Sequence, residues 1–197
     1  MTYYVVRDAY RIGIFDDHNE CQEATRNHPE KSVGFTTRDE AEAFMGSWGT
    51  KAINDNADGF LVAVISGSHS TEINKYSYGI QLILPNGELR GLKDIPADQE
   101  YFESEDITGD VFGTIDALEW ASENGYEKVK IYYAYDGLEK WLTGVYKARS
   151  EIGKMYQKKF TNYQLHLEID FVHVPVGDRF LYYEKAYELA REALNLK

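Results

Sequence analysis

The feature that most constrains the fold is an uncharged, mainly apolar run that begins at Phe60. Its sequence, FLVAVISGS, is long enough to cross the middle of a sheet and predicts a central strand. The next two segments, YSYGIQLIL and ELRGLKDI, flank the turn Pro85-Asn86-Gly87 and predict a hairpin. The second half of the chain is therefore expected to build a sheet around this buried run.

Helical and strand patterns alternate after the hairpin. Residues 108–124 predict a helix with a continuous buried face, made by Ile107, Val111, Thr114, Ile115, Leu118 and Ala121. Further strands are expected at 128–133 and 164–174, and further helices at 137–142, 149–160 and 179–194. The resulting order, βββ-α-β-α-α-β-α, fits a mixed sheet with helices on its faces.

A smaller unit precedes this region. Residues 3–7, 11–15 and 33–36 favour strands. A helix over about 17–26 would be capped by Asp16 or Asp17, and Thr37 with Glu40 forms a capping box for a second helix. The order ββαβα in so few residues supports only a thin core.

The predicted domain boundaries follow from these patterns. Residues 1–46 form the first domain and 59–197 the second. Residues 47–58 lack periodicity and are rich in Gly and Asn, which predicts a linker.

The charge of the chain limits its partners. The formal net charge is −12, and both predicted domains are acidic, with five Lys/Arg against nine Asp/Glu in residues 1–46. This balance opposes non-specific binding to phosphate backbones. The single cysteine, Cys21, excludes an intramolecular disulfide and is expected in the core. No apolar run approaches the length of a membrane span, so we expect a cytoplasmic protein that does not bind membranes.

Several segments carry a family resemblance. YYVVR, GIF, Cys21, Phe35 and AEAF resemble the small hybrid-binding domain of type 1 ribonuclease H, also called the viroplasmin N-terminal domain. VISGS, YGIQLI, TGDVFGTIDALEWASENGY, IYYAYDGLEKW and EKAYELAREAL are similar to the ribonuclease H catalytic domain. The resemblance implies an α/β fold, with an RNase H-like mixed five-stranded sheet and helices on both faces, preceded by a small ββαβα domain.

The resemblance also implies a chemistry. Ribonuclease H uses two Mg²⁺ or Mn²⁺ ions to hydrolyse the RNA strand of an RNA–DNA hybrid. Four carboxylates hold these ions, on the first strand, the first helix, the fourth strand and the last helix of the catalytic domain. Hard divalent cations need such clustered oxygen ligands.

This chain departs from that carboxylate pattern. The matching positions are Ser66, Asp110, Ala134 and Tyr187, so only Asp110 keeps a carboxylate, and an auxiliary acid is retained as Glu184. Asp110 and Glu184 are therefore the candidate catalytic residues, and Asp110 is the metal ligand if there is one. We expect Tyr187 to fill the former metal pocket, with its hydroxyl near Asp110 or Ser66.

Other residues could replace what is lost. Glu72, Glu105, Asp106 and Asp136 could rebuild an acidic cluster, although we expect them to be surface or capping residues. In the small domain the family binds the hybrid with aromatic residues and lysines, and His18 stands where an aromatic residue is usual. The candidate nucleic-acid contacts that remain are Arg7, Tyr10, Arg11 and Lys31.

The sequence thus favours an RNase H-fold protein that has lost hydrolysis and acts through binding, with no cofactor. Its expected partners are an RNA–DNA hybrid or double-stranded RNA, bound weakly, or a protein partner or second copy of the chain. The alternative is a ribonuclease H that uses Mg²⁺ or Mn²⁺ with a rearranged carboxylate set.

Overall fold

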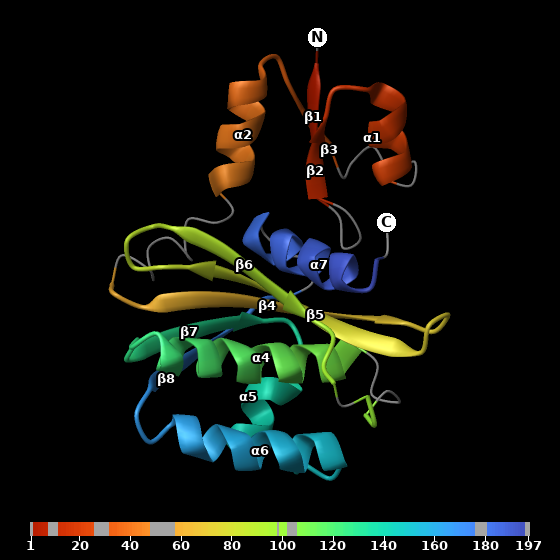
Figure 1. Cartoon of the computed structure of the whole chain (residues 1–197). Helices are drawn as coiled ribbons and strands as arrows, with labels where there is room; N and C mark the ends of the chain where they lie inside the picture. The colour runs from red at the N-terminus through yellow and green to blue at the C-terminus, as the bar shows by residue number, and fades with distance from the viewer. Residues whose placement is uncertain are drawn as a thin grey trace.

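The chain forms two separate sheets, each with its own helices (Figure 1). The structure is a computed structural model that describes residues 2–7, 12–25, 32–47, 58–97, 99–101, 106–175 and 181–195. Within these residues, no helix is both long and apolar enough to cross a membrane.

The small sheet is antiparallel, with strand order β2-β1-β3. Its strands are β1 (Tyr3–Arg7), β2 (Ile12–Phe15) and β3 (Ser32–Phe35), and its helices are α1 (His18–Ala24) and α2 (Arg38–Ser47). This is the predicted ββαβα order.

Both helices of the small unit begin at the predicted caps. The Asp17 carboxylate accepts the Asn19 and Glu20 amides at 2.7 and 3.0 Å. Thr37 and Glu40 form the reciprocal capping box, with both bonds at 3.2 Å. Cys21 is 3% exposed and packs against Val6, which confirms its predicted place in the core.

The large sheet is mixed, with strand order β6-β5-β4-β7-β8. Strands β4 (Leu61–Ser70), β5 (Lys75–Ile83) and β6 (Leu89–Asp94) pair with one another antiparallel. Strand β7 (Lys128–Tyr133) pairs in parallel with β4, and β8 (Glu168–His173) pairs in parallel with β7. The predicted central strand is indeed central, because β4 pairs on both sides and is almost entirely buried.

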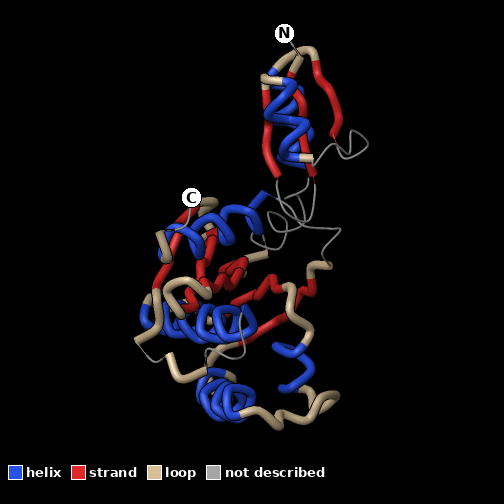
Figure 2. Tube along the Cα trace, turned by 90° about the vertical axis from the view of Figure 1, so that its right-hand side faces the viewer, coloured by secondary structure: helices blue, strands red, loops and turns tan. Residues whose placement is uncertain are grey.

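Helices cover both faces of this sheet, as Figure 1 shows and Figure 2 repeats from the side. Helices α4 (Asp106–Glu123), α5 (Gly137–Leu142) and α6 (Glu151–Tyr163) lie on one face, and α7 (Leu181–Ala193) lies on the other. The five-stranded mixed sheet with helices on both faces is the predicted fold.

One predicted strand is too long. Residues 164–174 were expected to be extended, but β8 begins only at Glu168. Helix α6 continues to Tyr163, and the Tyr163 carbonyl accepts the amides of His166 and Leu167 at 3.1 and 2.9 Å. These turn bonds use the backbone groups that a strand would have placed in the sheet.

Helix α4 carries a partly buried acid, Asp116, on its sheet-facing side. Asp116 accepts a hydrogen bond from Tyr78 on β5. Burial raises the pKa of Asp116; the Tyr78 bond opposes this rise, while the nearby carboxylates of Glu119, Asp94 and Glu123 add to it. Because this pKa is higher in the folded chain than in the unfolded chain, ionisation of Asp116 destabilises the fold.

We therefore expect Asp116→Asn to stabilise the protein at neutral pH, since the amide oxygen still accepts the Tyr78 hydroxyl. The gain in the free energy of unfolding should vanish below the ordinary aspartate pKa of about 4 and grow as the pH rises through the folded pKa. Urea unfolding between pH 3.5 and 7 measures it. Glu119→Gln, at an exposed position of the same acidic group, is the control and should change stability less. A destabilised Asp116→Asn at pH 7 would contradict this account.

Candidate functional site

The four positions expected to correspond to the family's metal ligands lie on β4, α4, α7 and the segment after β7. Ser66 lies on β4 opposite Gly79 of β5, and it is 2% exposed. Directly paired residues point to the same face of a sheet, and a Cβ at Gly79 would overlap the Ala186 carbonyl of α7. Ser66 therefore faces α7, and it offers only a neutral hydroxyl there.

Asp110 joins α4 to the central strand. Its Oδ1 accepts the backbone N–H of Gly67 at 2.6 Å, and the side chain is 7% exposed. The preceding residue, Gly109, allows this approach, because a Cβ there would come within 2.7 Å of the Gly67 Cα. The one retained carboxylate is thus already engaged in a short, charge-assisted bond between α4 and β4.

Ala134 follows β7 and packs into an apolar cluster. The partly buried side chains of Ala134 and Tyr182 lie against buried Val64, Tyr132 and Tyr183. The methyl group of Ala134 offers no atom that could bind a metal ion. The fourth-strand position therefore contributes packing and no ligand atom.

Helix α7 carries Glu184, the auxiliary acid, and Tyr187, which stands where the family is expected to have a carboxylate. Glu184 is 7% exposed in the first helical turn, where the helix dipole favours a negative charge. Tyr187 is partly exposed, and the Arg191 guanidinium lies 5.8 Å from the centre of its ring. Within the described residues its hydroxyl makes no hydrogen bond to Asp110 or Ser66. That Tyr187 fills the former metal pocket stays a prediction.

The helical phase of α7 explains why Tyr187 is partly exposed. Tyr183, Ala186 and Ala190 recur at helical spacing and are buried against the sheet. Tyr187 comes one residue, and about 100° of rotation, after Ala186. Its side chain is therefore directed to the margin of the buried face.

The substitute acids do not assemble into a new cluster among the described residues. Asp136 is bound by two side chains, the ammonium of Lys140 and the imidazole of His173, the latter at 3.1 Å. The hydrogen bond from Lys140 is the main reason that the pKa of Asp136 is lowered. Glu72 is exposed in the turn after β4, whereas Glu105 and the side chain of Asp106 lie outside the described residues.

These donor groups do not fit a pair of divalent ions. Of the four corresponding positions, three are neutral and the carboxylate of the fourth binds a backbone amide. In the part of the chain that the structure describes, no group of three His, Cys, Asp or Glu side chains could hold a metal ion. Mg²⁺ and Mn²⁺ sites require more clustered oxygen ligands than this.

The predicted nucleic-acid contacts in the small unit are not tested by the structure. Tyr10, Arg11 and Lys31 lie outside the described residues, and so does the side chain of Arg7 at the end of β1. The aromatic position taken by His18 is described, and its ring lies 5.4 Å from that of Tyr4 with a tilt of 54°.

Comparison with known proteins shows what each of the two units is similar to. Residues 2–45 match the family model for the ribonuclease H1 N-terminal domain. RNase H1 from the halophilic archaeon Halobacterium salinarum NRC-1 is 20% identical, with a TM-score of 0.58 over 70% of this chain and 98% of that one. The large unit has the ribonuclease H1 fold.

Two other solved structures share this fold. LC11-RNase H1, isolated from compost and solved in complex with an RNA/DNA hybrid, is 17% identical with a TM-score of 0.56. That match covers 68% of this chain and 96% of that one. The N-terminal RNase H domain of rv2228c from Mycobacterium tuberculosis is 14% identical, with a TM-score of 0.53 over 68% and 94%. No curated protein matches the sequence.

Sequence reasoning missed two parts of this site. The binding of Asp136 by Lys140 was detectable, because acidic and basic residues four apart meet on a helix. The Asp110–Gly67 bond was not, because it joins residues 43 positions apart through the packing of α4 on β4.

We expect Asp110→Ala to destabilise the fold by about 2 kcal/mol, because the buried Gly67 amide loses a charged acceptor. Asp110→Asn keeps an acceptor oxygen and should cost less. Chemical denaturation of the metal-free protein measures both variants. Equal stability of Asp110→Ala and the parent protein would show that this bond has no structural role.

Proposed function

We propose that this chain is a ribonuclease H-like protein that has lost hydrolysis and acts by binding an RNA–DNA hybrid or double-stranded RNA. The proposal rests on the side chains at the four positions matched to the family's metal ligands. Asp110 is the only carboxylate among them, and it already accepts the Gly67 amide. The fold that presents these positions is retained around them.

Two divalent ions about 4 Å apart repel each other strongly, and clustered carboxylates must offset that repulsion. Ser66, Ala134 and Tyr187 supply no negative charge. Glu184 remains on α7, but a pair of carboxylates is fewer than such a centre needs.

The binding half of the proposal rests on the small unit. Its match to the ribonuclease H1 N-terminal domain covers residues 2–45, and the related LC11 enzyme was solved with an RNA/DNA hybrid. The net charge of −12 works against a polyanion at long range, so binding should be weak and sensitive to salt.

The alternative function is metal-dependent cleavage of the RNA strand by a rearranged carboxylate set. Asp110, Glu184 and Asp136 would be its acids. The two side chains bound to Asp136 count against it, because a metal ion would have to displace Lys140 and His173.

We expect no cleavage of a labelled RNA–DNA hybrid above background in either Mg²⁺ or Mn²⁺. The assay compares the parent chain with Asp110→Ala and with a known ribonuclease H as positive control. Metal-dependent cutting by the parent chain that Asp110→Ala abolishes would defeat the proposal and support the alternative.

We expect hybrid binding at low salt that weakens as salt rises and falls further in Lys31→Ala and Arg7→Ala. Each lost phosphate contact should weaken binding and flatten the salt dependence. Fluorescence anisotropy measures both effects, and Lys75→Ala on the large unit is the matched control. Absence of binding at low salt would remove the nucleic-acid partner and leave a protein partner or a second copy, which sedimentation can then examine.

A further inference from the structure

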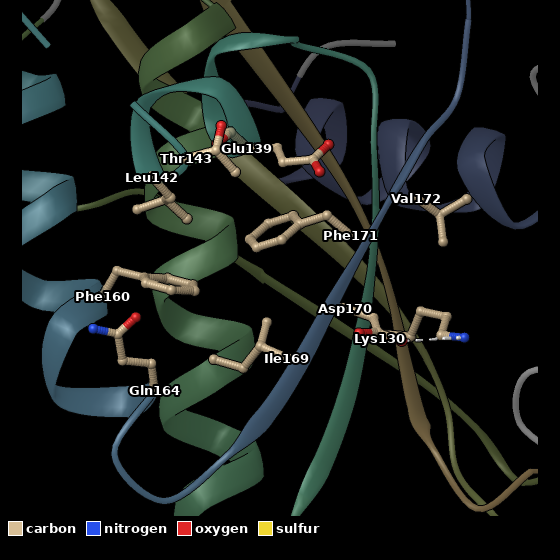
Figure 3. A pocket seen from close by; sticks show the side chains of 10 residues that line it. All are labelled: Lys130, Glu139, Leu142, Thr143, Phe160, Gln164, Ile169, Asp170, Phe171 and Val172. Carbon is tan, nitrogen blue, oxygen red and sulfur yellow. Dashed lines mark hydrogen bonds and ion pairs between the residues drawn. The ribbon is translucent and has the colours of Figure 1, made fainter. Parts of the chain in front are cut away.

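A pocket of about 530 Å³ lies along β8, at the edge of the large sheet. Figure 3 shows the side chains of Leu142, Phe160, Ile169 and Phe171 pointing into the space between β8, α5 and α6. This volume is within the range of sites that bind small molecules or single side chains.

The apolar wall of the pocket is well ordered by aromatic packing. The Phe160 and Phe171 rings lie 5.8 Å apart, and Phe171 also meets the Tyr133 ring edge-on at 5.7 Å. Contacts of this kind fix ring orientation and contribute beyond their buried area. These two ring contacts connect β8 with α6 and with β7 along the pocket wall.

A carboxylate lines the same pocket. Glu139 of α5 is half-buried, and its Oε2 accepts the Tyr133 hydroxyl at 2.5 Å. Burial, together with the Glu139 carboxylate, raises the pKa of Tyr133, so its hydroxyl keeps its proton and donates.

No cation of the described residues pairs with Glu139. Lys140, the next residue, pairs with Asp136. Lys130, which also lines the pocket, lies 3.6 Å from Asp170. The pocket wall therefore holds a carboxylate that no cation of the described residues pairs with.

We propose that this pocket binds an organic cation, an ammonium or guanidinium group on an apolar stem. The stem packs on Leu142, Phe160 and Ile169, and the charged head reaches Glu139. The aromatic ring faces add cation–π attraction, and the bound cation offsets the desolvation of the carboxylate. This inference is independent of the proposed nucleic-acid function.

Two sources can present this chemistry. One is a free small amine. The other is a Lys or Arg side chain on an extended peptide, which could pair with the edge of β8, because β7 is the only strand hydrogen-bonded to β8 in the described sheet.

Nuclear magnetic resonance titration of the full chain separates charge from apolar fit. The probes are hexylamine, a cation at pH 7, and 1-hexanol, its neutral counterpart. We expect saturable shifts at Thr143 and Phe171, and about tenfold tighter binding of hexylamine than of hexanol. Equal affinity of the two probes would overturn the proposal. So would the absence of chemical-shift changes at these residues with either probe.

Variants then locate the charge. Glu139→Gln keeps an oxygen for the Tyr133 hydroxyl, so it should weaken hexylamine binding about tenfold and leave hexanol binding unchanged. Glu151→Gln, an exposed position on α6 that pairs with Lys154, is the matched control and should change neither. Undiminished hexylamine binding by Glu139→Gln would contradict the assignment.

Titration with a peptide identifies the source of the cation. The probe is the acetylated, amidated pentapeptide Val-Thr-Lys-Val-Thr, compared with the same peptide carrying norleucine in place of Lys. Tighter binding than hexylamine, with shifts along β8, supports a protein segment, and binding of hexylamine alone supports a small molecule. Failure of both cations to bind overturns the proposal.

Discussion

The large unit depends on the close approach of α4 to the central strand. Glycines at 67 and 109 let the two backbones meet, and the Asp110 carboxylate then accepts the Gly67 amide at 2.6 Å. A buried amide without an acceptor would be costly, so this bond gives Asp110 a role in the fold. The same bond commits the one carboxylate retained at the corresponding metal positions, which links the architecture to the loss of hydrolysis that we propose.

The other positions matched to metal ligands carry neutral side chains. Ser66 faces α7 with a hydroxyl, and Ala134 packs with tyrosines of β7 and α7. Asp136, the nearest alternative acid in sequence to Ala134, is bound by Lys140 and His173. These contacts occupy the side chains that would have to rearrange around a divalent ion.

Much of the fold could be predicted because local patterns determine it. The buried run after Phe60 identified the central strand, and the Thr37–Glu40 spacing identified a helix start. The start of β8 was missed because the last turn of α6 extends to Tyr163. The orientation of Tyr187 and the pocket beside β8 depend on helix phase and on packing between distant segments, which a single sequence does not specify.

The most direct measurement of the central claim is Mn²⁺ binding followed by paramagnetic broadening of backbone amide signals. If the donor set cannot gather paired ions, Mn²⁺ at millimolar concentration will cause no saturable broadening at Gly67, Asp110 or Ala134. Stoichiometric binding of two Mn²⁺ ions, with the signals of these residues lost first, would contradict the account.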